Sequence, residues 1–228
     1  MTKLHHTTHG RDQVHAQLRE SLEKLGRSSV DLYLIHNPKG GMLLETWAAM
    51  LEAKRQGLAL SVGVSNFGLE QMEALKSSGL ELPEVNQIEL HPWLAQTELV
   101  GFCQRHEIQV MGYRPTANGF RFGMALEDPA LAQRRVAVVQ RIAERHGKTA
   151  AQVAIKWSAQ LGCVTIPKTV TTSRMVENAE AVSESWSLSN EDMAELAGLD
   201  EGLHTLGASE GQHIPWALVE TGVPKDQW

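Results

Sequence analysis

Short apolar segments, rich in β-branched and aromatic residues, recur along the chain and alternate with amphipathic helical patterns. The segments are nearly continuous hydrophobic runs, which is typical of parallel strands that are covered on both faces. Because helical patterns separate the apolar segments, the chain is expected to fold as repeated strand–helix units around a parallel sheet. The predicted strands are 30–35, 60–64, 84–90, 108–113 and 163–166.

The helical patterns carry their own start and stop signals. Thr149 with Gln152, and Ser189 with Asp192, have the spacing of residues that cap the start of a helix. The stretch 116–132 is irregular, so we expect a long loop there. On the first predicted helix the core-facing residues are Val14, Leu18, Leu22 and Leu25, and the stop residue is Gly26.

The composition is that of an ordinary globular protein, with 42% hydrophobic and 21% charged residues. A formal net charge of -6 argues against a nucleic acid or an anionic membrane as partner. No apolar run approaches the ~18 residues of a membrane span, and no signal-peptide pattern opens the chain, so we expect a cytoplasmic protein. Cys103 and Cys163 are expected to be reduced thiols. Because no linker divides the 228 residues, we expect one domain over 1–228.

Polar or aromatic side chains stand where the predicted strands stop. In a parallel α/β barrel, catalytic residues collect at the carboxyl ends of the strands. Any one of these residues is equally well explained as a solvated loop residue, but together they favour a site. A doubly wound sheet has the same periodicity as a barrel, although the G-x-G-x-x-G motif that would favour it is absent. The strand-end residues are Lys3, His36, Ser65, Asn66, 87–91, Tyr113 and Lys168.

The last strand end has the features of a phosphate site. A helix is expected to begin near Arg174, with Thr172 or Ser173 as its cap. The unpaired amides of a helix start, together with Lys168 and Arg174, favour a bound phosphate. The alternative is an ordinary solvated first turn. Glu177 and Asn178 share the helix face of Arg174 and are placed to hydrogen-bond a base attached to that phosphate.

Five motifs, in order along the chain, resemble those of the aldo-keto reductases. The run 166–178, I-P-K-T-V-T-T-S-R-M-V-E-N, resembles the cofactor signature of that family, and D-L-Y-L-I-H at 31–36 resembles the motif that ends in its active-site histidine. The runs 63–67, 85–89 and 149–157 also match in order. The resemblance covers about 1–199. It implies a (β/α)8 TIM barrel that uses NADPH to reduce an aldehyde or ketone to an alcohol.

The same resemblance assigns cofactor roles to individual residues. Lys168 and Arg174 would hold the adenosine 2′-phosphate, which favours NADP over NAD, and Tyr113 would stack on the nicotinamide ring. Arg114 stands where the family commonly has a small residue beside the pyrophosphate. The full set of implied cofactor-binding residues is Ser65, Asn66, Gln87, Tyr113, Lys168, Thr169, Val170, Arg174, Glu177 and Asn178.

Of the family's catalytic Asp, Tyr, Lys and His, the resemblance identifies only Lys3 and His36. The aspartate and the tyrosine belong to a segment before the third strand of the family's barrel. Tyr33 lies inside a strand and Tyr113 is the expected ring-stacking residue, so neither is placed to donate the proton. We therefore expect an incomplete barrel that starts at the end of strand 3, lacks strands 1 and 2, and has impaired activity. Its open edge allows oligomers or aggregation, whereas the complete form is expected to be a monomer.

Two other functional classes stay open. One is a non-catalytic NADP(H)-binding regulator or redox sensor, and the other is a shortened product with no stable fold. His5, His6 and His9 have a metal-like H-H-x-x-H pattern, but no carboxylate lies at metal-ligand spacing, so we predict no metal. From about 200 the chain is expected to form a variable substrate loop, which contains His213, Trp216 and Trp228.

Overall fold

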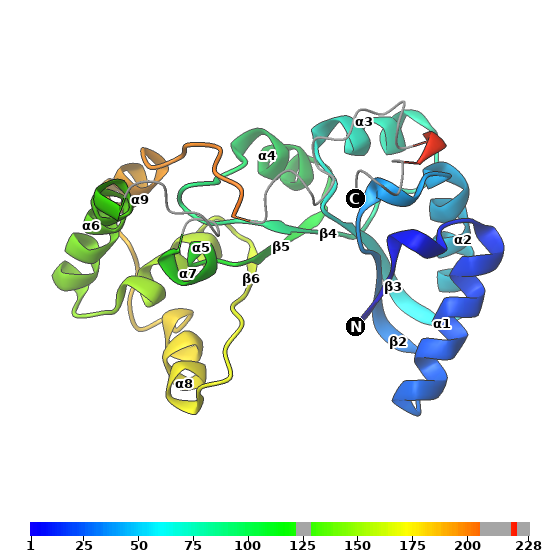
Figure 1. Ribbon diagram of the computed structural model, residues 1–228, viewed down its shortest axis with the longest axis horizontal. Helices are drawn as coiled ribbons and strands as arrows, with labels where there is room; N and C mark the ends of the chain where they lie inside the picture. The colour runs from blue at the N-terminus through cyan, green and yellow to red at the C-terminus, as the bar shows by residue number, and fades with distance from the viewer. Residues whose placement is uncertain (122–128, 206–219, 223–228) are drawn as a thin grey trace. The chain divides into compact units, whose positions relative to one another are not determined.

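The computed structural model describes residues 1–121, 129–205 and 220–222, and in it strands alternate with helices as the sequence predicts (Figure 1). The predicted strands are each confirmed to within two residues at either end. The strands are β1 (Thr2–Leu4), β2 (Val30–Ile35), β3 (Ala59–Ser65), β4 (Val85–Glu89), β5 (Gln109–Tyr113) and β6 (Val164–Ile166). The helices are α1 (Arg11–Leu25), α2 (Leu43–Arg55), α3 (Leu69–Ser77), α4 (Thr97–Arg105), α5 (Ala117–Phe120), α6 (Pro129–His146), α7 (Ala150–Gln160), α8 (Thr172–Ala181) and α9 (Asn190–Ala197), with short 3-10 turns η1 (His6–Thr8) and η2 (Pro38–Gly40).

The sheet has the strand order β1-β2-β3-β4-β5-β6, which is the order of the strands along the chain. The pairs β1–β2, β2–β3, β3–β4 and β5–β6 are parallel. A doubly wound sheet reverses its strand order at a switch point, whereas a barrel adds each new strand beside the last. The sequential order therefore favours the barrel type and argues against the doubly wound alternative.

The chain divides into two compact units. The described part of unit 1 is 1–87, 98–109 and 220–222, and that of unit 2 is 88–97, 110–121 and 129–205. The expectation of one domain over 1–228 stays a prediction. Unit 1 carries β1 to β3 and the start of β4, and unit 2 carries the end of β4, most of β5, and β6.

In unit 1, α1 and α2 lie side by side against the strands (Figure 1). Val14, Leu18 and Leu22 are buried on the inner face of α1, as the sequence predicts. The expectation for Leu25 is wrong, because its side chain is 52% exposed. Residues 23–28 are all exposed, so the end of α1 extends past the core before Gly26 turns the chain in the left-handed conformation.

A side-chain hydrogen bond connects β1 and β4 in unit 1. Lys3 Nζ donates a hydrogen bond of 2.5 Å to Oε1 of Gln87, although β2 and β3 separate their strands in the sheet. In a flat sheet, three strand spacings would hold β1 and β4 ~14 Å apart. Because the two side chains meet, Lys3 and Gln87 lie on the same face of the sheet, and any curl of β1 to β4 toward that face shortens the distance between them. Curvature of this kind is what a barrel requires.

In unit 2, α7 packs against α6, α8 and β6, while α9 packs on α6. Both predicted capping boxes are confirmed, and Thr149 and Ser189 are the N-caps of α7 and α9. The expected irregular stretch 116–132 ends too late, because α6 begins at Pro129, while the short turn α5 has a left-handed, irregular backbone at Ala117–Phe120. The remainder of that loop, 122–128, lies outside the described residues, as do His213, Trp216 and Trp228.

Cys103 and Cys163 are buried thiols that form no disulfide with each other, as expected for structural cysteines. Burial raises the pKa of the Cys163 thiol to about 11, so it stays protonated and unreactive at neutral pH. In the part of the chain that the structure describes, every helix is too short or too polar to cross a bilayer.

Candidate active site

The carboxyl ends of β1 to β4 bring five of the predicted strand-end residues together in unit 1. Lys3 lies in β1, beside Leu4, and the amide of His36 donates 2.9 Å to the carbonyl of Leu4. Ser65 ends β3 and pairs in register with Gln87 of β4. The structure therefore places Lys3 and His36 on the same edge of the sheet, as the sequence predicts.

Hydrogen bonds connect these side chains into one network. Ser65 Oγ donates 2.8 Å to the carbonyl of Gln87, whose side chain accepts from Lys3. Asn66 Nδ2 donates 3.0 Å to the carbonyl of His36 and 3.3 Å to Ser65 Oγ. Asn66 has φ +62, a left-handed conformation that asparagine tolerates better than most residues. The network holds amide, hydroxyl and ammonium groups at the ends of four neighbouring strands.

The surroundings of His36 favour its neutral form. Burial has the largest effect and lowers the pKa of His36, and the positive charges of Lys3 and His5 lower it further. The imidazole therefore carries one proton at neutral pH and can donate one hydrogen bond. The ring centroid of His5 lies 6.2 Å from that of His36.

The loop after β1 holds the three histidines of the H-H-x-x-H pattern. The rings of His5 and His6 have centroids 4.0 Å apart, and His9 Nδ1 lies 2.9 Å from the carbonyl oxygen of Gly41. Within the described residues, no three His, Cys, Asp or Glu side chains are grouped as metal ligands would be. The metal alternative therefore has no geometric support in these segments.

The two tyrosines lie where the sequence predicts. Tyr33 is fully buried in β2, and its hydroxyl donates 3.5 Å to the carbonyl of Val14 in α1. Burial raises the pKa of Tyr33 far above its usual range, which makes it a poor proton donor to a ligand. Tyr113 ends β5 in unit 2.

In unit 2, the cofactor signature runs from the end of β6 into α8. Lys168 and Arg174 are both exposed, and neither forms a hydrogen bond or an ion pair with any residue in the described segments. Val170 is 86% exposed, and Thr169 Oγ1 accepts 3.1 Å from the amide of Thr171. The prediction of Thr172 or Ser173 as the cap is wrong, because α8 begins two residues before Arg174 with Thr171 at the N-cap.

The N-cap of α8 differs from those of α7 and α9. The side chain of Thr171 makes no capping hydrogen bond, and its backbone amide donates to Oγ1 of Thr169. The first amides of α8 are therefore not satisfied by their own cap residue, and such amides attract anions.

Glu177 of α8 is held by the start of α7. The hydroxyl of Thr149 donates to the carboxylate of Glu177, and Gln152 Nε2 donates 3.2 Å to the carbonyl of Glu177. Thr149 and Gln152 therefore do more than cap α7. Their second role fixes one face of α8 on which Asn178 also lies.

Glu89 and His91, both within the predicted strand-end run 87–91, form a buried cluster with Thr205, which the sequence did not single out. Glu89 is 1% exposed; its carboxylate lies 3.3 Å from His91 Nε2 and accepts 3.1 Å from the amide of Thr205. Burial works to raise the pKa of Glu89, but hydrogen bonds from His91 and Thr205 outweigh it and lower the pKa. Arg114 Nη1 donates 3.0 Å to Thr205 Oγ1. Arg114, noted in the sequence for its place beside the expected pyrophosphate, thus binds the segment that follows α9.

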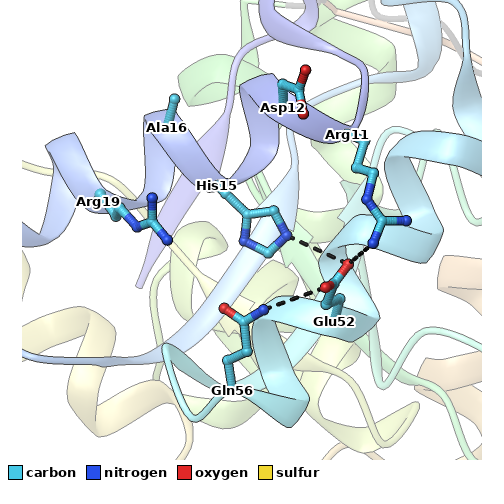
Figure 2. A pocket seen from close by; sticks show the side chains of 7 residues that line it. All are labelled: Arg11, Asp12, His15, Ala16, Arg19, Glu52 and Gln56. Carbon is cyan, nitrogen blue, oxygen red and sulfur yellow. Dashed lines mark hydrogen bonds and ion pairs between the residues drawn. The ribbon is translucent and has the colours of Figure 1, made fainter.

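A cavity of about 310 Å³ lies elsewhere in unit 1, between α1 and α2, and Figure 2 shows the side chains that line it. At its centre Glu52 accepts 2.6 Å from Arg11 and 3.4 Å from Gln56, while His15 lies 3.7 Å away. These contacts join α1 to α2. The cavity contains none of the strand-end residues, so we assign it a packing role.

Comparison with known proteins identifies similar chains. The model described as the aldo/keto reductase family matches residues 1–201. An aldo-keto reductase of Mycolicibacterium smegmatis is 39% identical over 203 residues, which cover 88% of this chain and 67% of that protein. The methylglyoxal reductase DkgA of Escherichia coli K12 is 36% identical over 88% of this chain and 69% of its own length.

Solved structures agree with the sequence comparison. The crystal structure of a Bombyx mori aldo-keto reductase in complex with NADP has a TM-score of 0.80 at 32% identity, covering 91% of this chain and 70% of that one. This similarity, together with the sequential parallel strands, shows a TIM-barrel-like α/β fold. The chain spans about two thirds of the length of its curated relatives, between 61% and 69% of those compared.

Proposed function

The chain belongs to the aldo/keto reductase family, and on that premise we propose that it is an oxidoreductase that uses NADPH to reduce an aldehyde or a ketone to an alcohol. The observation that carries the proposal is the pair Lys3 and His36 at one edge of the sheet, in a network with Ser65, Asn66 and Gln87.

The phosphate end of the cofactor fits the start of α8. Lys168 and Arg174 have no ionic partner among the described residues, and the cap of α8 leaves its first amides unsatisfied by a side chain. Two cations beside such amides suit a phosphate monoester, which NADPH carries on its adenosine and NADH lacks. Glu177 and Asn178, which share the face of Arg174, are proposed to contact the adenine. These features support NADPH as the preferred cofactor.

The nicotinamide end fits the polar network of unit 1. We propose that Ser65, Asn66 and Gln87 bind the carboxamide group, because amides and hydroxyls match its donors and acceptor. Tyr113 is proposed to stack on the nicotinamide ring. When bound, the cofactor supplies the hydride that reduces the carbonyl carbon.

His36 and Lys3 act on the substrate oxygen. A neutral His36 donates a hydrogen bond to the carbonyl, and the ammonium of Lys3 places a positive charge near the oxygen as negative charge develops there. Both effects stabilise the alkoxide more than the carbonyl, which is the condition for catalysis. The small carbonyl substrate is not specified further by these two residues.

We assign no residue of this chain to donate the proton that the substrate oxygen needs. Tyr33 is buried against Val14 and is not placed to serve, so the chain by itself is proposed to turn over slowly. Loss of a general acid typically costs ~10²–10⁴-fold in rate. The expectation of a barrel that lacks strands 1 and 2 stays a prediction.

A second candidate is a binding protein for NADP(H) that performs no reduction. This second candidate is favoured by the burial of Tyr33, because a binding protein needs no proton donor. The proposed phosphate site at Lys168 and Arg174 would serve such a protein equally well.

The two candidates are separated by measuring cofactor binding and turnover on one sample. The folded chain is titrated with NADPH by fluorescence, and NADPH oxidation is then followed with a reactive aldehyde. The reductase proposal expects binding and a slow oxidation that His36→Gln abolishes. Binding without oxidation above the rate of free NADPH would support the second candidate, and absence of binding would refute both.

A further inference from the structure

Arg114 leaves the end of β5 in a backbone conformation that an arginine rarely adopts. Its φ is +53, and Ala117, Asn118 and Phe120 in the turn that follows also have positive φ. The left-handed region is strained for a residue with a side chain, and such a residue persists only where the surrounding structure holds it. The contacts of Arg114 are therefore needed to hold the chain where it leaves β5, directly after Tyr113.

A chain of hydrogen bonds connects Arg114 to the end of β4. Arg114 Nη1 donates 3.0 Å to Oγ1 of Thr205 and 3.2 Å to its carbonyl oxygen. The Thr205 hydroxyl in turn donates to the carboxylate of Glu89. Because this hydroxyl accepts from a cation while it donates to an anion, each of the two bonds strengthens the other. We call Arg114, Thr205 and Glu89 the strand-end bridge.

Two members of the strand-end bridge are buried, and the segment that carries Thr205 is held by further bonds. Glu89 is 1% exposed and Thr205 is 4% exposed. The amide of Thr205 donates 3.1 Å to the carboxylate of Glu89, and the amide of Leu203 donates 2.9 Å to the carbonyl of Trp93. The segment before Arg114's partner is therefore fixed to the turn that follows β4, and it offers Arg114 a well-ordered acceptor.

Tyr113 is held on both sides by these contacts. Its carbonyl accepts 3.1 Å from the amide of Leu90, and Tyr113 pairs in register with Ile166 of β6. Its side chain is half-buried, so part of the ring is accessible to a ligand. Backbone bonds thus connect Tyr113 to the neighbouring strands, while the strand-end bridge holds Arg114, the residue that follows it.

We propose that Arg114 and Thr205 are positioning residues, which hold the ring of Tyr113 in the orientation that stacks on a planar ring of the cofactor. The inference rests on the proposed function for the identity of that ring, the nicotinamide of NADPH. Neither residue touches the reacting atoms. A ring that is already ordered loses little conformational freedom on binding, so the strand-end bridge adds to cofactor affinity through Tyr113.

The position of the Tyr113 ring is tested by NMR without any cofactor. The chain has 2 tyrosines, so ¹³C-tyrosine labelling gives ring signals from Tyr113 and from Tyr33, which is buried in unit 1 and serves as the internal control. Arg114→Ala and Thr205→Val should both shift or broaden the Tyr113 signals and leave those of Tyr33 in place. Thr205→Ser keeps the hydroxyl and should leave both sets in place. Should Thr205→Val fail to fold, Arg114→Ala, which shortens a side chain that is not fully buried, carries the test.

Cofactor affinity, measured by calorimetry, then tests what the ring position contributes. NADPH should bind to Thr205→Val roughly 2- to 10-fold more weakly than to the wild type, as expected for one aromatic contact. Adenosine 2′,5′-bisphosphate, which lacks the nicotinamide, should bind both equally, which a general loss of structure would not allow. In a Tyr113→Ala background, Thr205→Val should cause no further loss, because the strand-end bridge acts through the ring. Arg121→Ala removes an exposed arginine at the end of α5 and should leave NADPH affinity unchanged.

The outcomes separate this inference from the proposed function. A wild-type chain that binds no NADPH would refute the proposed function, whereas the tyrosine signals would still decide whether the strand-end bridge holds the ring. If the wild type binds NADPH, three results would each overturn the inference. These are unchanged Tyr113 signals in both folded bridge variants, an equal loss of affinity for adenosine 2′,5′-bisphosphate, and additive losses of NADPH affinity in the double variant.

Discussion

The ammonium of Lys3 and the side-chain carbonyl of Gln87 form a 2.5 Å hydrogen bond between strands that are not neighbours in the sheet. The bond links the ends of β1 and β4 on one face of the sheet, and it places a positive charge among the polar side chains at the strand ends. Gln87 thus orients Lys3, in addition to its proposed contact with the nicotinamide.

Removal of the Lys3 charge should change the titration of His36. Lys3 lowers the pKa of His36, second only to burial, so Lys3→Met is expected to raise that pKa toward its ordinary value. NMR titration of the histidine ring signals measures the change. Lys24→Met, which removes an exposed lysine of α1, should leave the His36 pKa where it is. A lower His36 pKa in Lys3→Met would contradict the assigned geometry.

Asp192 at the start of α9 should make stability depend on acid pH. Burial alone would raise the pKa of the Asp192 carboxyl. Hydrogen bonds from Arg145, His146 and Ser189 have a larger combined effect and lower that pKa well below its usual range. A depressed pKa contributes stability that is fully present above the unfolded value of about 3.9 and is lost progressively as the pH falls from there through the lower folded pKa. Asp192→Asn should cost about 1–3 kcal/mol at pH 7 in urea unfolding and less at pH 3.

The neighbouring Glu191 provides the matched control for that experiment. Its side chain is exposed, so Glu191→Gln should leave the unfolding free energy nearly unchanged at both pH values. The same loss for Asp192→Asn at pH 3 and pH 7 would show that the carboxylate charge is not the source of the stability.

Thr205 should anchor the segment after α9. Its hydroxyl donates to Glu89 and accepts 3.0 Å from Arg114, so Thr205→Val leaves both partners without it at nearly constant side-chain volume. We expect a loss of about 1–3 kcal/mol in unfolding free energy and a rise in the pKa of Glu89. Thr205→Ser keeps the hydroxyl and should retain most of the stability. Equal losses in both variants would assign the effect to packing.

Much of the fold was predictable because its signals are local. The strands are short runs of buried side chains, and Thr149 and Ser189 cap helices through residues only three positions away. The site of unit 1 was predictable for the same reason, since parallel strands place Lys3, His36 and Ser65 on one edge once their ends are known.

The features that were missed depend on residues far apart in the chain. Thr205 meets Glu89 across 116 positions, and no local pattern marks either residue as a partner. Lys39 lies in η2 and is only 7% exposed, although no pattern in the sequence marks it as a buried residue. The start of α8 was placed too late because Thr169, Thr171, Thr172 and Ser173 are all acceptable caps, and sequence alone does not choose among them.

The central claim, an NADP-specific cofactor site at Lys168 and Arg174, is tested most directly by comparing NADPH and NADH affinities. Fluorescence titrations are run on the wild type, on Arg174→Ala, and on Arg19→Ala as an exposed arginine outside the signature. The wild type should prefer NADPH, and Arg174→Ala should weaken NADPH by roughly 10- to 100-fold, as expected for one charge-assisted hydrogen bond of about 1.5–3 kcal/mol, with NADH and Arg19→Ala unaffected. Equal affinity for the two cofactors, unchanged in Arg174→Ala, would contradict the account.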